Sequence, residues 1–210
     1  MNSKVQQKWN QIYRNDAVAE QYPQPAEVVV DFAHLLPATG CALELACGKG
    51  GNSLFLAKQG LDCLAWDISN VALEQLATQA EKARLTIHTE VRDIESESLP
   101  VNCFDVIVVA HFLNRSICEQ IVKMLKPGGL LFYQTFTVDA LELGFGPKNP
   151  DYLLQPNELI RLFKQLQIHG YREDGFTSDS QTSLPGVAYL VASKHTLQGE
   201  RITNDQKTTS

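Results

Sequence analysis

The chain has 210 residues, of which 44% are hydrophobic, and its formal net charge is -6. This length fits one medium-sized domain better than two, and the apolar content suffices for a substantial core. The negative charge argues against a nucleic-acid or anionic-membrane partner, because such partners need clustered Lys and Arg side chains. No apolar stretch has the length of a signal peptide or a membrane span, so we expect a cytoplasmic protein without a membrane partner. The sequence leaves the oligomeric state open.

Cysteine and histidine are scattered along the chain. There are five of each, no Cys-x-x-Cys pair occurs, and the histidines lack the spacing of metal ligands. Several cysteines lie in apolar runs, which is typical of reduced, buried thiols in a cytosolic protein. The sequence therefore predicts no metal site.

The N-terminal part combines a helical pattern with a proline break. Residues 3–13 are polar except for an apolar stripe at spacings of three to four residues, which predicts an amphipathic helix. The stripe consists of Val5, Trp9, Ile12 and Tyr13. We expect it to pack against the protein rather than contact a ligand. Pro25 is well placed in the first turn of a second helix, 26–36, which Pro37 and Gly40 end.

From residue 42 onward, strand patterns alternate with helical patterns. The predicted strands are 42–46, 61–66, 85–91, 104–110, 130–136, 168–173 and 187–192, and the predicted helices are 52–58, 70–83, 116–125 and 155–167. This alternation predicts a Rossmann-like, doubly wound α/β fold with helices on both faces of the sheet. We expect the sheet to be mainly parallel, with one late antiparallel strand. In such a sheet the ligand binds beyond the carboxyl ends of the strands, so the loops that follow the strands carry the site.

The first predicted strand ends in a glycine-rich turn. It contains Gly48, Gly50 and Asn52, and its glycines let the backbone turn sharply and approach a ligand closely. A dinucleotide-binding turn has a third glycine, but Ser53 stands at that position. Glu44, just before the turn, suits a cationic ligand better than a pyrophosphate. The alternative for Glu44 is a carboxylate satisfied by neighbouring backbone N–H groups, although burial beside the turn favours a functional role.

Acidic side chains also follow the next two strands. Asp67 is placed to accept hydrogen bonds from both hydroxyls of a ribose. The alternative is an N-cap on the next helix, for which Ser69 is the better candidate. Asp93 is placed to accept a hydrogen bond from an adenine amino group, while Ile94 covers the adenine ring. The alternative for Asp93 is a solvated residue in a turn.

The loop after the strand 104–110 is expected to face the reactive end of the ligand. His111 is a candidate general base, because histidine titrates near neutral pH, or else a loop residue that shapes the pocket. Arg115 either steers an anionic substrate or pairs with an acidic side chain. The sequence leaves both pairs of alternatives open.

Four segments also carry a family resemblance. They are ALELACGKGGNSLFLAKQGLDCLAWDIS (42–69), RDIE (92–95), FDVIVVAHFLNRS (104–116) and LKPGGLLFYQTF (125–136). In this order and spacing, they resemble class I S-adenosylmethionine-dependent methyltransferases, especially the small bacterial branch around the tellurite-resistance methyltransferases. The resemblance implies S-adenosylmethionine as the cofactor and tellurite or selenite as candidate acceptors.

The resemblance also implies a role for each residue at the strand ends. Glu44 and Gly48 would flank the methionine portion, Asp67 would bind the ribose, and the backbone at Ala110 would run beside the sulfonium. Ala46 stands where the family usually has its first loop glycine. The full set of implied cofactor contacts is Glu44, Ala46, Gly48, Gly50, Asn52, Asp67, Ile68, Asp93, Ile94 and Ala110.

We accordingly divide the chain into three parts. Residues 1–24 form an N-terminal helical segment, and the resemblance makes it a candidate lid with Trp9, Tyr13 and Arg14 as candidate lid residues. Residues 25–195 form the S-adenosylmethionine-binding methyltransferase domain, and residues 196–210 form a polar tail that we expect to be frayed.

The predicted reaction is methyl transfer by in-line displacement to a small molecule or an oxyanion. An anionic acceptor needs no base, whereas a hydroxyl or amine acceptor would use His111. Two other functions remain as alternatives: an NAD-dependent oxidoreductase, which Ser53 and Glu44 disfavour, and a non-catalytic cofactor-binding module.

Overall fold

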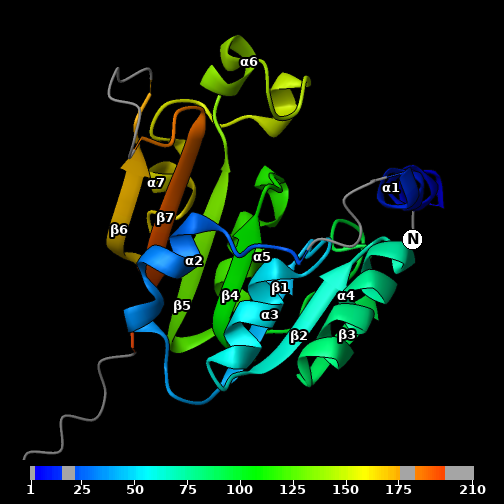
Figure 1. Cartoon of the computed structure of the whole chain (residues 1–210). Helices are drawn as coiled ribbons and strands as arrows, with labels where there is room; N and C mark the ends of the chain where they lie inside the picture. The colour runs from blue at the N-terminus through cyan, green and yellow to red at the C-terminus, as the bar shows by residue number, and fades with distance from the viewer. Residues whose placement is uncertain (1–2, 16–21, 176–182, 197–210) are drawn as a thin grey trace, which may run out of the picture.

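The computed structural model describes residues 3–15, 22–175 and 183–196. Within these residues, seven strands form one sheet in the order β3-β2-β1-β4-β5-β7-β6 (Figure 1). The strands are β1 (Cys41–Leu45), β2 (Asp62–Asp67), β3 (Ile87–Val91), β4 (Phe104–Ala110), β5 (Leu125–Phe136), β6 (Gln167–Glu173) and β7 (Val187–Ser193). Neighbouring strands pair in parallel except at β7, which is antiparallel to both β5 and β6. The predicted fold class is confirmed.

Helices cover both faces of this sheet. The α-helices of the described residues are α1 (Ser3–Asn15), α2 (Glu27–Asp31), α3 (Gly51–Lys58), α4 (Asn70–Ala83), α5 (Cys118–Met124), α6 (Asp139–Leu143) and α7 (Glu158–Leu162), of which α1 and α6 lie beyond the ends of the strands (Figure 1). One core cluster joins α2 and α3 to Val106 and Val108 of β4, and another joins α5 and α7 to Ile107 and Val109. Since successive side chains of a strand point to opposite faces, the uninterrupted apolar run of β4 is buried on both sides.

Two predicted helices are shorter than expected. The helix predicted at 26–36 is α-helical only over α2 and continues as a 3-10 turn, Ala33–Leu35. At its end the Phe32 ring packs edge-on against Tyr189 at 6.0 Å, so a tertiary contact interrupts the helical pattern. The helix predicted at 155–167 is reduced to α7, which begins after Asn157 in the left-handed region (φ 59°). Helix α6, which lies just before the loop 144–150 rich in Gly and Pro, was not predicted from the sequence.

Helix α1 packs only partly with the face that was predicted. Val5, Trp9 and Ile12 are 38%, 40% and 43% exposed, so the prediction that these three pack against the protein is wrong, whereas Tyr13, the fourth residue of the stripe, is half-buried. The buried residue is Asn10, whose Oδ1 accepts from the Ser69 hydroxyl (2.7 Å) and whose Nδ2 donates to Asn70 Oδ1 (2.8 Å). The helix contacts a polar surface, the start of α4, and a polar side chain therefore serves it better than an apolar one.

Two further predictions concern the ends of the chain and membranes. Most of the predicted tail, residues 197–210, lies outside the described residues, as do residues 16–21 of the N-terminal segment.

Within the described ranges, no helix is long and apolar enough to span a bilayer. The same part of the chain holds no group of three or more metal-binding side chains.

Candidate active site

The glycine-rich turn joins β1 to α3 and has a left-handed backbone. Ala46, Gly48 and Gly50 have φ values of 52°, 52° and 72°. Backbone hydrogen bonds fix the turn, from Cys47 N–H to the Trp66 carbonyl (3.0 Å) and from Gly50 N–H to the Cys47 carbonyl (2.8 Å). Because a side chain in this conformation costs roughly 1–2 kcal/mol, Ala46 is under strain where a glycine would be free of it.

Glu44 is buried beneath the first turn of α3. Its Oε2 accepts from the Ser53 backbone N–H (2.7 Å) and hydroxyl, and its Oε1 accepts from Asn52 Nδ2 (2.8 Å). Burial raises the pKa of Glu44 to about 7, although these donors partly oppose the rise. The contacts therefore fit both alternatives, a brace between β1 and α3 and an acceptor for a cationic ligand.

Asp67 connects the end of β2 to the glycine turn. Its Oδ2 accepts from the Gly48 N–H and its Oδ1 from the Ser69 N–H, both at 2.8 Å. Burial raises the pKa of Asp67, and the backbone N–H groups oppose this. The Ser69 hydroxyl accepts from Ala72 N–H (3.2 Å) and caps α4, so the N-cap is Ser69 and not Asp67.

Asp93 and Ile94 follow β3 and are 6% and 7% exposed. The Asp93 carbonyl accepts from the N–H groups of Ser96 (3.0 Å) and Glu97 (3.1 Å), which forms a tight turn. Ile68, after β2, is half-buried. The strands β1, β2 and β3 are parallel neighbours, so their carboxyl ends lie at the same end of the sheet. The acidic residues Glu44, Asp67 and Asp93 stand at these carboxyl ends.

Beyond β4 lie His111 and a set of residues that was not predicted from the sequence. Ala110, the last residue of β4, is half-buried, and the His111 N–H donates to the Gln134 carbonyl (2.9 Å). The Gln134 side chain is 1% exposed, accepts from the Val28 N–H (3.0 Å) and donates to the Glu27 carboxylate. The signal for Gln134 in the sequence is a glutamine inside an otherwise apolar strand.

The His111 side chain is exposed to solvent, yet protein atoms crowd its ring. This desolvation lowers the pKa of His111, and the Glu27 carboxylate opposes the shift. The ring lies 5.1 Å from that of Phe136, tilted by 31°. A histidine whose pKa is lowered is neutral at pH 7 and has a free nitrogen to accept a proton.

Arg115 makes the ion pair that was one of its two alternatives. Its Nε and Nη2 donate to the Glu158 carboxylate (2.6 and 2.9 Å). The same guanidinium donates to the carbonyls of Asp151 (2.6 Å) and Leu153 (2.9 Å). The hydrogen bonds of the Arg115 guanidinium thus connect the loop after β4 to the segment before α7.

We expect Arg115→Lys to lower the free energy of unfolding by roughly 1–3 kcal/mol, because a lysine cannot form this set of charge-assisted hydrogen bonds. Affinity for S-adenosylhomocysteine should stay unchanged. Urea unfolding and calorimetry measure the two effects. Arg161→Lys is the matched control, since Arg161 donates to the Pro156 carbonyl from an exposed position. Unchanged stability together with a raised KM for the acceptor would instead assign Arg115 to the substrate.

Helix α1 lies beside the start of α4 (Figure 1), and its Tyr13 side chain reaches the glycine turn. A Cβ built on Gly48 would stand 2.7 Å from the Tyr13 hydroxyl oxygen. Gln75 of α4 donates to the Tyr13 carbonyl (3.1 Å), and the Trp9 ring lies 6.0 Å from that of Tyr13. Contact with the turn supports the lid hypothesis, which stays a prediction.

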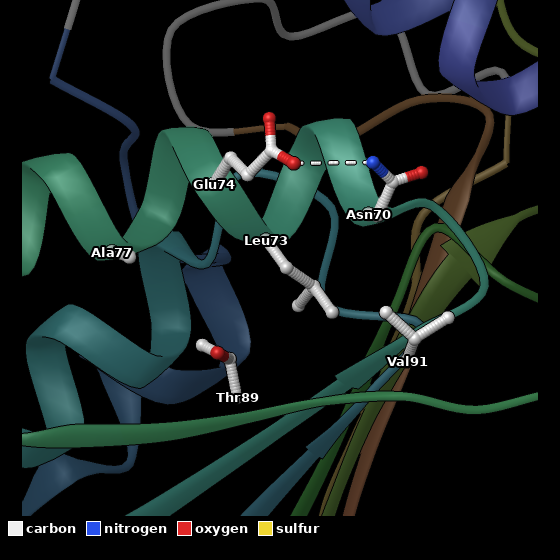
Figure 2. Close-up of a pocket in the computed structure, with 6 residues that line it drawn as sticks. All are labelled: Asn70, Leu73, Glu74, Ala77, Thr89 and Val91. Carbon is white, nitrogen blue, oxygen red and sulfur yellow. Dashed lines mark hydrogen bonds between the residues drawn. The ribbon is translucent and has the colours of Figure 1, made fainter.

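A groove of about 260 Å³ lies between α4 and the edge strand β3 (Figure 2). It is lined by Asn70, Leu73, Glu74, Ala77, Thr89 and Val91. Asn70 Nδ2 donates to Glu74 Oε1 (3.1 Å) along its rim. None of the predicted cofactor contacts lines this groove.

Comparison with known proteins agrees with this geometry. Residues 42–129 match the methyltransferase domain family. The probable S-adenosyl-L-methionine-dependent methyltransferase TehB of Haemophilus influenzae is 31% identical over 154 residues, 70% of this chain and 52% of that protein. The crystal structure of TehB from the same organism matches with a TM-score of 0.67 at 25% identity, over 86% of this chain and 67% of that chain. A ubiquinone biosynthesis O-methyltransferase of Coxiella burnetii is 30% identical over 138 residues, 57% of this chain and 59% of that protein.

A Rossmann-like sheet with a glycine turn after β1 and acidic residues at the ends of β1 to β3 is typical of nucleotide-binding α/β proteins. Together with the match over residues 42–129, it makes the chain similar to class I S-adenosylmethionine-dependent methyltransferases, whose cofactor is S-adenosylmethionine. The match also argues against the NAD-dependent alternative. The chain spans just over half the length of the curated relatives it matches.

Proposed function

We propose that this chain transfers a methyl group from S-adenosylmethionine to a small molecule or an oxyanion. The observation that carries the proposal is the row of three buried carboxylates, Glu44, Asp67 and Asp93, at the ends of adjacent strands. A carboxylate can accept about four hydrogen bonds, more than the protein's own donors supply to Glu44 and Asp67, so each can also accept from a ligand donor or pair with a cation. S-adenosylmethionine offers both, as an ammonium group, ribose hydroxyls and an adenine amino group. The chemistry of the residues therefore fits this cofactor.

In the proposed site, Glu44 faces the ammonium group, Asp67 the ribose, and Asp93 with Ile68 and Ile94 the adenine. Gly48 has no Cβ, and the Tyr13 hydroxyl of α1 fills the space that one would take, so α1 closes over the turn at this point. The remaining assigned contacts are the backbone and side chains of Ala46, Gly50, Asn52 and Ala110. When bound, the cofactor supplies a methyl group on a positively charged sulfonium, whose leaving thioether is neutral. The protein then contributes orientation and exclusion of water more than acid–base chemistry.

The acceptor divides into two chemical classes. An oxyanion such as tellurite or selenite, which the sequence resemblance suggests, is already a nucleophile and needs no base. A hydroxyl group, such as the acceptor class implied by an O-methyltransferase, has to lose a proton, for which His111 is the candidate base. A cytoplasmic location belongs to the same proposal.

Substituting Asp67 by Ala tests the cofactor site. We expect affinity for S-adenosylhomocysteine to fall by roughly 1–3 kcal/mol, because polar groups of the ligand and the Gly48 N–H lose their acceptor. Calorimetry on the folded variant measures the loss, with NADH as the negative ligand. Unchanged affinity would remove Asp67 from the site, and binding of NADH alone by the wild-type chain would end the assignment.

A further inference from the structure

His111, Gln134 and Phe136 form a cluster at the carboxyl ends of β4 and β5. His111 follows β4, and Gln134 and Phe136 belong to β5. Alternate residues of a strand share a face, so Gln134 and Phe136 point to the same side of the sheet. The contact between the rings of His111 and Phe136 brings His111 to that side as well.

Glu27 is fixed at this cluster from the start of α2. The Gln134 amide donates to the Glu27 carboxylate through Nε2 and accepts from the Val28 N–H through Oε1. Gln134 thus anchors the first turn of α2 to β5. Glu27 is also the charged group whose field acts on His111.

The charges of the side chains around this cluster disfavour the binding of an anionic acceptor. Glu27 contributes a carboxylate, and His111 is uncharged at neutral pH because desolvation lowers its pKa. The guanidinium of the same loop, Arg115, is occupied by Glu158 and by backbone carbonyls. A site with this balance repels an oxyanion and accepts a neutral molecule.

Apolar surface gathers beside the cluster. Phe145 packs edge-on against Phe136 at 6.0 Å and is 41% exposed, and Leu141 and Leu143 of α6 are also each 41% exposed. Helix α6 projects beyond the carboxyl end of β5 (Figure 1). Phe145 thus places an exposed aromatic ring beside Phe136, and exposed apolar side chains next to polar groups are typical of ligand sites.

Resting on the proposed function, we propose that the methyl acceptor is an uncharged aromatic molecule with a hydroxyl group, which packs against Phe136 and Phe145. His111 removes the hydroxyl proton, and Glu27 is a positioning residue that stabilises the imidazolium. The acceptor oxygen forms a bond to the methyl carbon with its electron pair. The carbon–sulfur bond breaks, its electrons stay on sulfur, and the proton ends on the imidazole ring.

Two aromatic probes separate this mechanism from the others: 4-methylphenol, which is neutral at pH 7, and thiophenol, which is largely ionised. We expect His111→Asn to lower kcat with 4-methylphenol by about 100-fold or more, the typical contribution of a general base. With thiophenol the loss should be small, because no proton has to be removed. Asparagine is chosen because it tolerates the left-handed backbone of His111 (φ 55°).

The variant Glu27→Gln should lower kcat with 4-methylphenol by about fivefold and leave KM unchanged, since it removes only the charge beside the imidazole. The matched control is Glu119→Gln, an exposed glutamate on α5, for which we expect no change. As a readout besides turnover, titration of 4-methylphenol into the S-adenosylhomocysteine complex should shift the His111 imidazole resonances.

Four outcomes would overturn the acceptor assignment: faster turnover of tellurite than of 4-methylphenol, no turnover of either aromatic probe, an equal loss with both probes in His111→Asn, or no shift of the imidazole resonances. Calorimetry with S-adenosylhomocysteine separates these from a deeper failure. If the wild-type chain binds it, the acceptor class alone is wrong, whereas absent binding contradicts the proposed function itself.

Discussion

Glu44→Gln is expected to make the ligand-free protein more stable above pH 7 and to weaken cofactor binding. A pKa raised from 4.5 to about 7 means that the folded state disfavours the ionised carboxylate. The corresponding free energy is on the order of 3 kcal/mol. Glutamine carries no charge and avoids this cost, but its NH2 group cannot accept the hydrogen bonds that one of the two Glu44 oxygens accepts, so the net gain above pH 7 is smaller than this free energy. Glutamine also cannot neutralise an ammonium group. We expect affinity for S-adenosylmethionine to fall by roughly 1.5–3 kcal/mol.

The sign of the pH dependence follows from the direction of the shift. The folded protein holds a proton on Glu44 to higher pH than the unfolded chain, so the stabilisation is complete below pH 4.5 and is lost as the pH rises towards 7. Asp67, whose pKa is also raised, adds to the same trend. Urea unfolding at pH 5 and pH 8 should therefore show a decline in the wild-type chain that is much smaller in Glu44→Gln.

Glu44→Gln also decides between the two alternatives for this residue. If Glu44 only braces α3 through Ser53 and Asn52, the variant should lose stability at both pH values and bind S-adenosylmethionine normally. A wild-type chain and variant with the same pH dependence would show that the carboxylate ionises freely in the folded state. Proton release on cofactor binding, measured in two buffers of different ionisation enthalpy, gives an independent check.

Segments with a strong apolar pattern could be predicted from the sequence, because the pattern within each segment determines whether it forms a strand or a helix. The strand 104–110 and the helix 70–83 have the predicted bounds, the first because it is an uninterrupted apolar run and the second because its apolar residues recur at helical spacing. Short elements depend on their neighbours. Helix α2 ends where Phe32 packs on Tyr189, a contact between residues far apart in the chain that no local pattern contains.

The proposed cofactor contacts could be anticipated because they directly follow strands, and the carboxyl ends of parallel strands meet at one end of the sheet. On the proposed acceptor side only His111 could be anticipated in this way. Glu27 and Gln134 are separated by 107 residues and meet only because α2 packs on β5. The predicted face of α1 failed for the opposite reason, since apolar periodicity assumes an apolar partner, whereas Asn10 meets the polar cap of α4.

Gly51→Ala is expected to destabilise the fold and to weaken the site without changing any polar group. In a helix this substitution usually adds roughly 0.5–1 kcal/mol of stability. Here a Cβ would stand 2.2 Å from the Gln24 carbonyl oxygen, a backbone atom that cannot swing away. The segment before α2 has to move, which breaks the hydrogen bond from Ala26 N–H to Asn52 Oδ1 (2.8 Å). The net loss should be roughly 2–3 kcal/mol, as for overpacked cores.

The functional consequence of Gly51→Ala follows from the same displacement. Moving this segment shifts Glu27 away from His111 and shifts Asn52 away from Glu44, so both ends of the site lose a partner. Gly60→Ala is the matched control: its φ of 95° brings strain, but the nearest atom is an ordinary 3.5 Å away. We expect the control to lose roughly 1–2 kcal/mol of stability and to keep its affinity for S-adenosylhomocysteine. If Gly51→Ala instead unfolds at the wild-type urea concentration and binds the ligand equally well, the close packing of α3 against residues 22–26 does not hold the site together.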